Sequence, residues 1–189
     1  MNRILIMGPP GVGKGTQAER LAKMLNVPTI STGDLFREQV RNNTPLGVRI
    51  RGVLDSGGYV PDDVTNSLME DRLARPDAHE GFILDGYPRT LDQVLALDHI
   101  LARRSAELDA VVVLEADHAE IIDRMLARAA EQGRSDDSPE VINHRLEVYT
   151  TETAQLISAY DARGLVIRID GMGLPHVVEQ LIADALKGR

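Results

Sequence analysis

A glycine-rich stretch at residues 8–16 carries the clearest chemistry in the sequence. It reads Gly-Pro-Pro-Gly-Val-Gly-Lys-Gly-Thr and directly follows a short apolar run. The pattern Gly-x-x-x-x-Gly-Lys between a strand and a helix is typical of a loop that binds nucleotide phosphates. Glycines let backbone N–H groups turn toward phosphate oxygens, and Lys14 can reach the β- and γ-phosphates. Gly15 replaces the usual Ser or Thr after the lysine, and Thr16 follows one place later.

A second group of residues indicates Mg²⁺ and another anion beside this loop. The apolar run 81–85 ends in Asp85, whose carboxylate could hold Mg²⁺ directly or through water. The next five residues, Gly-Tyr-Pro-Arg-Thr, bring Arg89 to the same crevice, with Gln93 one helical turn further on. Upstream, Arg37 lies about one turn into a predicted helix. Two arginines near the loop predict a second anion-binding site.

The peptide bond between Tyr87 and Pro88 is a candidate for the cis form. It lies in the tight turn that presents Arg89, and cis bonds before proline occur typically in such turns.

Short β-branched apolar runs alternate with longer amphipathic stretches, which is typical of βαβ units around a buried parallel sheet. We expect strands at 3–7, 28–30, 81–85, 110–115 and 165–170. We expect helices near 14–25, 33–42, 45–56, 63–74, 91–104, 119–130, 139–163 and 175–187. The predicted fold is a three-layer α/β structure of the P-loop NTPase type, with a five-stranded parallel sheet.

Two stretches depart from this alternation. Residues 31–60 contain two predicted helices with no strand between them, and residues 128–138 are strongly polar. Parallel α/β sheets bind ligands at the carboxyl ends of their strands, so insertions there are candidate substrate covers. We therefore expect a core at 1–30, 61–127 and 139–189, a small helical segment at 31–60 and a short lid at 128–138.

The composition limits the remaining function classes. The 189 residues include 21 Lys and Arg against 29 Asp and Glu, a net charge of −8 with neutral histidine. This surplus, together with 3% aromatic residues and no tryptophan, disfavours a nucleic-acid partner. No apolar run approaches the roughly 18 residues of a membrane span, and cysteine is absent, which excludes a thiolate zinc site. We predict a cytoplasmic protein, most simply a monomer, with no membrane partner.

Taken together, the motifs resemble those of the adenylate kinase family. The matching stretches are 8–17, 31–37, 58–62, 81–90 and 134–137 with Arg145, so the match covers nearly the whole chain in order. The resemblance implies Mg²⁺-dependent, reversible phosphoryl transfer from ATP to AMP, giving two ADP, in purine nucleotide interconversion and energy homeostasis. Long members carry a β-structured lid that sometimes holds zinc. This chain has only the residues between Arg128 and Pro139 there, which indicates the short-lid form without zinc.

The resemblance also implies roles for individual residues. The residues expected in catalysis are Lys14, Arg89, Arg128, Arg134 and Arg145. The residues expected to bind ATP are Gly11, Val12, Gly13, Lys14, Gly15, Thr16, Arg128 over the adenine and Gly173. The residues expected to bind AMP are Thr32, Arg37, Gly58, Tyr59, Val60, Gly86, Tyr87, Pro88, Arg89, Gln93, Arg134 and Arg145. Asp85 is expected to hold Mg²⁺ through water, with Thr16 as a candidate second ligand.

Phosphoryl transfer to AMP sets a specific task for these residues. The attacking phosphate oxygen is already anionic at neutral pH, so the protein has to supply position and charge rather than a general base. ATP and AMP bring roughly six negative charges, which Mg²⁺ and the six cations, Arg37 included, can balance. Water has to be excluded, so segment 31–60 and the lid are expected to close over the substrates.

The nearest alternative is a UMP/CMP kinase, which shares this architecture and often the short lid. That family has Ser-Ala-Gly-Asp where this chain has Ser-Thr-Gly-Asp at 31–34, and Asn in place of Thr90, so the sequence favours AMP. A nucleotide-binding switch of the GTPase type would need an Asn/Thr-Lys-x-Asp guanine motif, and the sequence contains none. A non-catalytic nucleotide sensor would have little use for two complete phosphate sites.

Overall fold

Five parallel strands form the centre of the protein in the computed structural model. The structure describes residues 2–132 and 138–188, with the side chains of residues 118 and 128–132 outside the description. The strands are β1 (Asn2–Met7), β2 (Thr29–Ser31), β3 (Gly81–Asp85), β4 (Ala110–Glu115) and β5 (Val166–Asp170). Their order in the sheet is β2-β3-β1-β4-β5, and every neighbouring pair is parallel. All five carboxyl ends therefore lie along one edge of the sheet.

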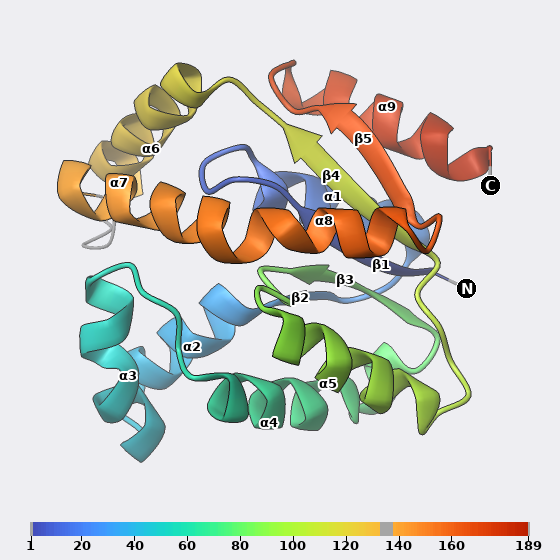
Figure 1. Ribbon diagram of the computed structural model, residues 1–189, viewed down its shortest axis with the longest axis horizontal. Helices are drawn as coiled ribbons and strands as arrows, with labels where there is room; N and C mark the ends of the chain where they lie inside the picture. Colours follow the sequence, from blue (N-terminus) through green and yellow to red (C-terminus); the bar gives the residue numbers. More distant parts are fainter. Residues whose placement is uncertain (1, 133–137, 189) are drawn as a thin grey trace.

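Helices connect the strands and cover the sheet (Figure 1). They are α1 (Lys14–Leu25), α2 (Thr32–Arg41), α3 (Pro45–Asp55), α4 (Asp62–Leu73), η1 (Pro76–Ala78), α5 (Leu91–Ala102), α6 (His118–Gln132), α7 (Pro139–Val148), the π-helical segment η3 (Tyr149–Thr153), α8 (Ala154–Asp161) and α9 (Pro175–Lys187). Within the described residues, no helix has the length and apolar character needed to cross a membrane.

Two hydrophobic clusters, one on each face of the sheet, produce the three layers. Successive side chains of a strand point to opposite faces. In β1, Leu5 and Met7 therefore join a cluster with residues of α4, α5 and α8, whereas Ile4 and Ile6 join a cluster with residues of α1 and α9. The predicted three-layer α/β fold with a five-stranded parallel sheet is confirmed.

Most predicted element boundaries lie within two residues of the observed ones. The cis form of the Tyr87-Pro88 bond is also confirmed. The predicted lid at 128–138 begins inside a helix, because α6 continues to Gln132. Residues 133–137, and with them Arg134, lie outside the described residues.

The helix predicted near 139–163 is observed over 139–161, but it is not one uninterrupted α-helix. A π-helical turn, η3, separates α7 from α8, and α8 ends at Asp161. Threonines account for the interruption, since their hydroxyls can bond to carbonyl groups of the preceding turn and bend the helix. Thr150 donates to the Leu146 carbonyl oxygen at 2.9 Å, and Thr151 to that of Glu147 at 3.0 Å.

Helices α2 and α3 pack against each other around a small hydrophobic cluster, which residues of α4 also border. Its buried members are Phe36, Ile50 and Val60, and none of them belongs to the clusters on the sheet. This helix pair lies at the end of the molecule opposite the start of β1 and the end of α9 (Figure 1). The small cluster holds residues 32–60 together beside the carboxyl edge of the sheet.

Replacing Gly47 with alanine is expected to lower the free energy of unfolding by about 2–3 kcal/mol, because a side chain at this position of α3 would collide with the backbone of α2. A Cβ at Gly47 would overlap the Gln39 carbonyl oxygen of α2. Gly52, in the same helix, has no such neighbour within 4 Å. Gly52→Ala should therefore raise the stability by about 0.5–1 kcal/mol through helix propensity. Urea unfolding measures both, and equal effects would contradict close packing at Gly47.

Candidate active site

The glycine-rich loop joins β1 to α1 at the carboxyl edge of the sheet. Gly8, Gly11 and Gly13 have φ angles of 141°, 87° and 99°, which residues with a side chain rarely adopt. A Cβ on Gly8 would also lie only 2.5 Å from the Leu114 carbonyl oxygen. The loop therefore needs glycine both for its backbone conformation and for its contact with β4.

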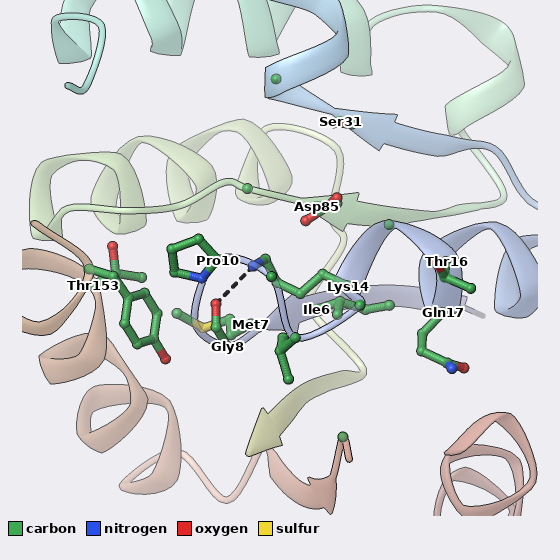
Figure 2. A pocket seen from close by; sticks show the side chains of 18 of the residues that line it. Ile6, Met7, Gly8, Pro10, Lys14, Thr16, Gln17, Ser31, Asp85 and Thr153 are labelled. Carbon is green, nitrogen blue, oxygen red and sulfur yellow. Dashed lines mark hydrogen bonds between the residues drawn. The ribbon is translucent and has the colours of Figure 1, made fainter. Parts of the chain in front are cut away.

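Lys14 is held directly over this loop. Its ammonium group donates hydrogen bonds to the carbonyl oxygens of Gly8 and Pro9, both at 2.9 Å. Figure 2 shows the side chain reaching back toward Gly8, with Asp85 on the neighbouring strand and Thr153 approaching from a separate helix. The positive charge of Lys14 thus lies beside the glycine-rich loop, which leads into the N-terminus of α1, and both features favour anions.

Two cavities adjoin at this edge of the sheet. The larger has a volume of about 540 Å³ and opens over the glycine-rich loop. The smaller, of about 60 Å³, lies between α2, residues 57–60 and the turn after β3. Seven residues line both cavities: Gly33, Arg37, Gly57, Tyr59, Gly86, Arg89 and Arg145. Three arginines therefore stand where the two cavities meet.

The structure brings nearly all the predicted site residues together around these two cavities. The larger cavity is lined by Gly11, Val12, Gly13, Lys14, Gly15, Thr16, Arg37, Tyr59, Asp85, Gly86, Tyr87, Pro88, Arg89, Arg145 and Gly173. The smaller is lined in addition by Thr32, Gly58, Val60 and Gln93. The Arg128 side chain and the whole of Arg134 lie outside the described residues.

Asp85 ends β3 beside the start of α1. It pairs in register with Ile6 of β1, and a Cβ on Gly15 would lie 3.6 Å from its Oδ2 atom. No group of three or more His, Cys, Asp or Glu side chains suited to a metal ion occurs among the described residues. A single carboxylate facing a phosphate loop fits Mg²⁺, which is commonly held by one or two carboxylates, water and substrate phosphates.

The turn after β3 fixes Arg89 at several points. Its Nε donates to the Gly86 carbonyl oxygen at 2.7 Å, and its backbone N–H donates to Gln93 Oε1 at 2.8 Å. The guanidinium lies 4.8 Å from the centre of the Tyr59 ring, a cation–π contact. Gly86 has φ of 78°, and a Cβ there would lie 2.8 Å from Arg89 Nη2. The turn therefore holds the guanidinium in one place.

Two predicted AMP contacts, Thr32 and Gln93, have hydrogen-bond partners within the protein. Thr32 donates to the Gly86 carbonyl oxygen at 2.7 Å. The side chain of Gln93, a residue only 2% exposed, donates to Asp62 Oδ1 at 2.6 Å besides accepting from Arg89. These bonds orient the turn that carries Arg89. Asp62, which also accepts from Thr90 Oγ1 at 2.6 Å, was not among the predicted site residues.

Sequence reasoning also missed Arg124. This residue lies on α6 and lines the larger cavity. Its guanidinium donates to the carbonyl oxygens of Gly171 and Met172 at 3.2 and 3.0 Å and pairs with Glu120 at 3.0 Å. It therefore borders the loop that contains Gly173. Arg124 and Arg128 are four residues apart, a spacing that places two positions on the same face of a helix. The sequence alone therefore cannot decide which of the two arginines borders the cavity.

Two residues of the π-helical segment, Tyr149 and Thr153, complete the wall of the larger cavity. Burial raises the pKa of Tyr149 to about 12, with a smaller contribution from Tyr59, so its phenol is neutral at neutral pH. Thr153 is 6% exposed and bonds to two residues of the site. The regular helix predicted for this stretch gave no sign that either side chain would face the cavity.

Comparison with known proteins identifies relatives along the whole chain. A family model described as adenylate kinase matches residues 6–165. A protein named adenylate kinase from Kocuria rhizophila is 50% identical over 184 residues, which cover 97% of this chain and 98% of that protein. A protein of the same name from Clavibacter michiganensis is 51% identical over 189 residues, covering 100% and 94%. A third, from Bifidobacterium longum, is 54% identical over 171 residues, covering 90% and 92%.

Proposed function

The chain belongs to the adenylate kinase family and is a phosphotransferase that acts on ATP and AMP, and from this premise we propose that its two adjoining cavities bind one nucleotide each. ATP would lie in the larger cavity on the glycine-rich loop, and AMP would reach the smaller. The observation that carries this proposal is the set of Arg37, Arg89 and Arg145, which line both cavities. A phosphoryl group passing between the nucleotides would pass these cations.

For ATP, the loop and the start of α1 supply the phosphate site. Backbone N–H groups of residues 11–16 and the Lys14 ammonium would hold the β- and γ-phosphates. The adenine would extend toward Gly173, where Arg124 borders the cavity. A guanidinium can stack on the flat face of a base, so we assign the adenine contact to Arg124 in preference to Arg128.

For AMP, segment 31–60 supplies most of one wall. Arg37 and Arg89 would bind the phosphate, and the backbone at 58–60 would run along the base. Thr32 lines this cavity and is one of the two residues, with Thr90, that distinguish the sequence from the UMP/CMP kinase pattern. The division into a core, segment 31–60 and a lid at 128–138 stays a prediction, as do a monomeric state and a cytoplasmic location.

The transfer itself requires charge and alignment. Lys14 would stabilise the negative charge on the transferred group, while Arg89 and Arg145 would balance the charge on the AMP side. The AMP phosphate oxygen attacks as an anion, so no side chain has to remove a proton. Bound Mg²⁺ would supply charge neutralisation and orientation of the ATP phosphates, held by Asp85 through water with Thr16 as a candidate second contact. Closure of segment 31–60 and the lid over the substrates would exclude water and so limit hydrolysis of ATP.

Replacing Asp85 with asparagine is expected to raise the Mg²⁺ concentration for half-maximal rate about tenfold, because an outer-shell carboxylate is lost. Asp71→Asn, on the exposed side of α4, is the matched control and should leave the Mg²⁺ titration unchanged. Initial rates at fixed total ATP give the titration. An unchanged midpoint for Asp85→Asn would remove Asp85 from the magnesium site.

A coupled assay tests the substrate assignment. ADP formation from ATP is measured with AMP, CMP, UMP and GMP in parallel, and kcat/KM is compared. AMP is expected to exceed the other three by at least about 100-fold, a difference that polar groups reading a base can produce. Comparable rates with CMP or UMP would favour the UMP/CMP kinase alternative instead.

A further inference from the structure

We propose that Thr153 is a positioning residue for Arg89. Together with Tyr59, Thr153 couples the position of segment 31–60 to the position of the Arg89 guanidinium. The proposal rests on the proposed function in one respect: Arg89 is taken to bind the phosphate of AMP. Thr153 itself was not among the predicted nucleotide contacts, although it lines the larger cavity. Its role follows from three contacts that join Tyr59, in the connection after α3, to the turn after β3 and the π-helical segment.

The three contacts form a closed ring. The Thr153 hydroxyl donates to the Arg89 carbonyl oxygen at 3.1 Å, and its oxygen lies 2.8 Å from the Tyr59 hydroxyl oxygen. The Arg89 guanidinium lies over the Tyr59 ring at 4.8 Å. Each residue therefore contacts both of the others, although they are up to 94 positions apart in the sequence.

The hydrogen positions follow from the chemistry of the groups. A carbonyl oxygen can only accept, so the single Thr153 hydroxyl proton points to Arg89. The bond to Tyr59 must then use the Tyr59 proton, with Thr153 as acceptor. Loss of the Thr153 hydroxyl would remove both hydrogen bonds at once. The Tyr59 hydroxyl would lose this acceptor, and the Arg89 carbonyl oxygen would lose this donor.

The π-helical turn explains why Thr153 can reach this position. A π-turn adds a residue to the helix and rotates the side chains that follow it. Thr150 and Thr151 bond to carbonyl oxygens of their own helix, whereas Thr153, two residues later, bonds across to the turn after β3. The interruption thus directs one hydroxyl out of the helix and into the site.

The consequence concerns Arg89. Its backbone N–H is held by Gln93, its carbonyl oxygen by Thr153 and its guanidinium by Gly86 and the Tyr59 ring. The only member of this set in segment 31–60 is Tyr59, and Thr153 fixes the hydroxyl end of its ring. Any displacement of Tyr59 that breaks the ring of contacts therefore also loosens the guanidinium.

The test compares Thr153→Val, Thr153→Ser and Thr151→Val with the full-length parent protein. Valine keeps the shape of threonine without its hydroxyl, and serine keeps the hydroxyl. Thr151 is exposed and bonds only within its own helix among the described residues, so Thr151→Val is the matched control. KM for AMP, kcat and the Kd for ATP are measured for each, together with the melting temperature.

Thr153→Val is expected to raise KM for AMP about tenfold and lower kcat several-fold, with Kd for ATP changed less than about twofold. Thr153→Ser should restore KM to within about threefold of the parent, and Thr151→Val should match the parent. Tyr59→Phe keeps the ring over Arg89 and removes only the hydroxyl, so a smaller rise of about threefold is expected. Tyr59→Phe should add nothing further in the Thr153→Val background, since both changes break the same bond.

Parent-like KM and kcat in Thr153→Val would overturn the proposal, and so would additive effects of the two changes. Equal losses of affinity for ATP and AMP would show that Thr153 has only a structural role. If Thr153→Val does not fold, Tyr59→Phe decides: an unchanged KM for AMP overturns the coupling. Arg89→Met distinguishes failure of the proposed function from failure of the role proposed for Thr153. Parent-like turnover of Arg89→Met would defeat the proposed function, whereas an impaired Arg89→Met beside a normal Thr153→Val would defeat only the role of Thr153.

Discussion

Replacing Lys14 with methionine is expected to lower kcat by about 10²–10³-fold while the fold survives. Removal of one preorganised group that stabilises transition-state charge typically has an effect of this size. Lys14 donates to the carbonyl oxygens of Gly8 and Pro9 at the centre of the loop, and methionine retains most of the length of its stem without the charge.

The Lys14 experiment needs kinetics and a check of the fold. Steady-state rates at saturating ATP and AMP give kcat, and thermal unfolding reports stability. Lys23→Met is the matched control, since Lys23 is exposed in the last turn of the same helix. Its kcat should equal that of the parent protein. Near-normal turnover in Lys14→Met would exclude Lys14 from the stabilisation of the transition state.

The second large effect is expected for Arg89→Ala, which should reduce kcat/KM for AMP by at least about 100-fold. A guanidinium that binds a phosphate contributes charge-assisted hydrogen bonds, and its loss leaves the anion without a partner. Binding of ATP should change less than about threefold, because the predicted ATP contacts are residues 11–16, Arg128 and Gly173 and do not include Arg89.

Binding titrations with each nucleotide alone distinguish this role from a general loss of structure. Arg103→Ala is the control, because Arg103 follows α5, is 62% exposed at its side chain and pairs only with Glu70 among the described residues. It should bind both nucleotides as the parent does. Equal loss of ATP and AMP affinity in Arg89→Ala would show that Arg89 supports the cavity as a whole and does not select AMP.

The fold could be predicted because local patterns and tertiary packing agree. The alternation of apolar strands with amphipathic helices gave every strand of the sheet, and both faces of β1 are apolar because both are covered. Gly13 could be placed at the carboxyl edge because its loop follows the strand β1, and Asp85 because it is the last residue of the strand β3. Local sequence carries this information, since glycine turns and strand ends are short-range features.

The remaining parts of the site depend on long-range contacts. Gln93 stays a predicted AMP contact and lines the smaller cavity, but the bond from its amide to Asp62, 31 positions away, could not be predicted. Arg124 is held at the cavity by hydrogen bonds to the carbonyl oxygens of residues 171 and 172, and no local sequence pattern predicts these bonds. Thr153 reaches Arg89 across 64 positions through a π-turn that helical periodicity cannot reveal. Each case requires knowledge of which elements meet.

The separate hydrophobic cluster of α2 and α3 has a consequence for local stability. Phe36, Ile50 and Val60 are buried in a small cluster that shares no buried residue with the two that hold the sheet. We therefore expect this part to open at a lower free energy than global unfolding requires. Only the closed fraction of molecules would bind AMP in the proposed site, and the apparent affinity scales with that fraction. Ile50 lines neither cavity. A substitution of Ile50 would still change the apparent affinity for AMP, because it would change the fraction of molecules in the closed form.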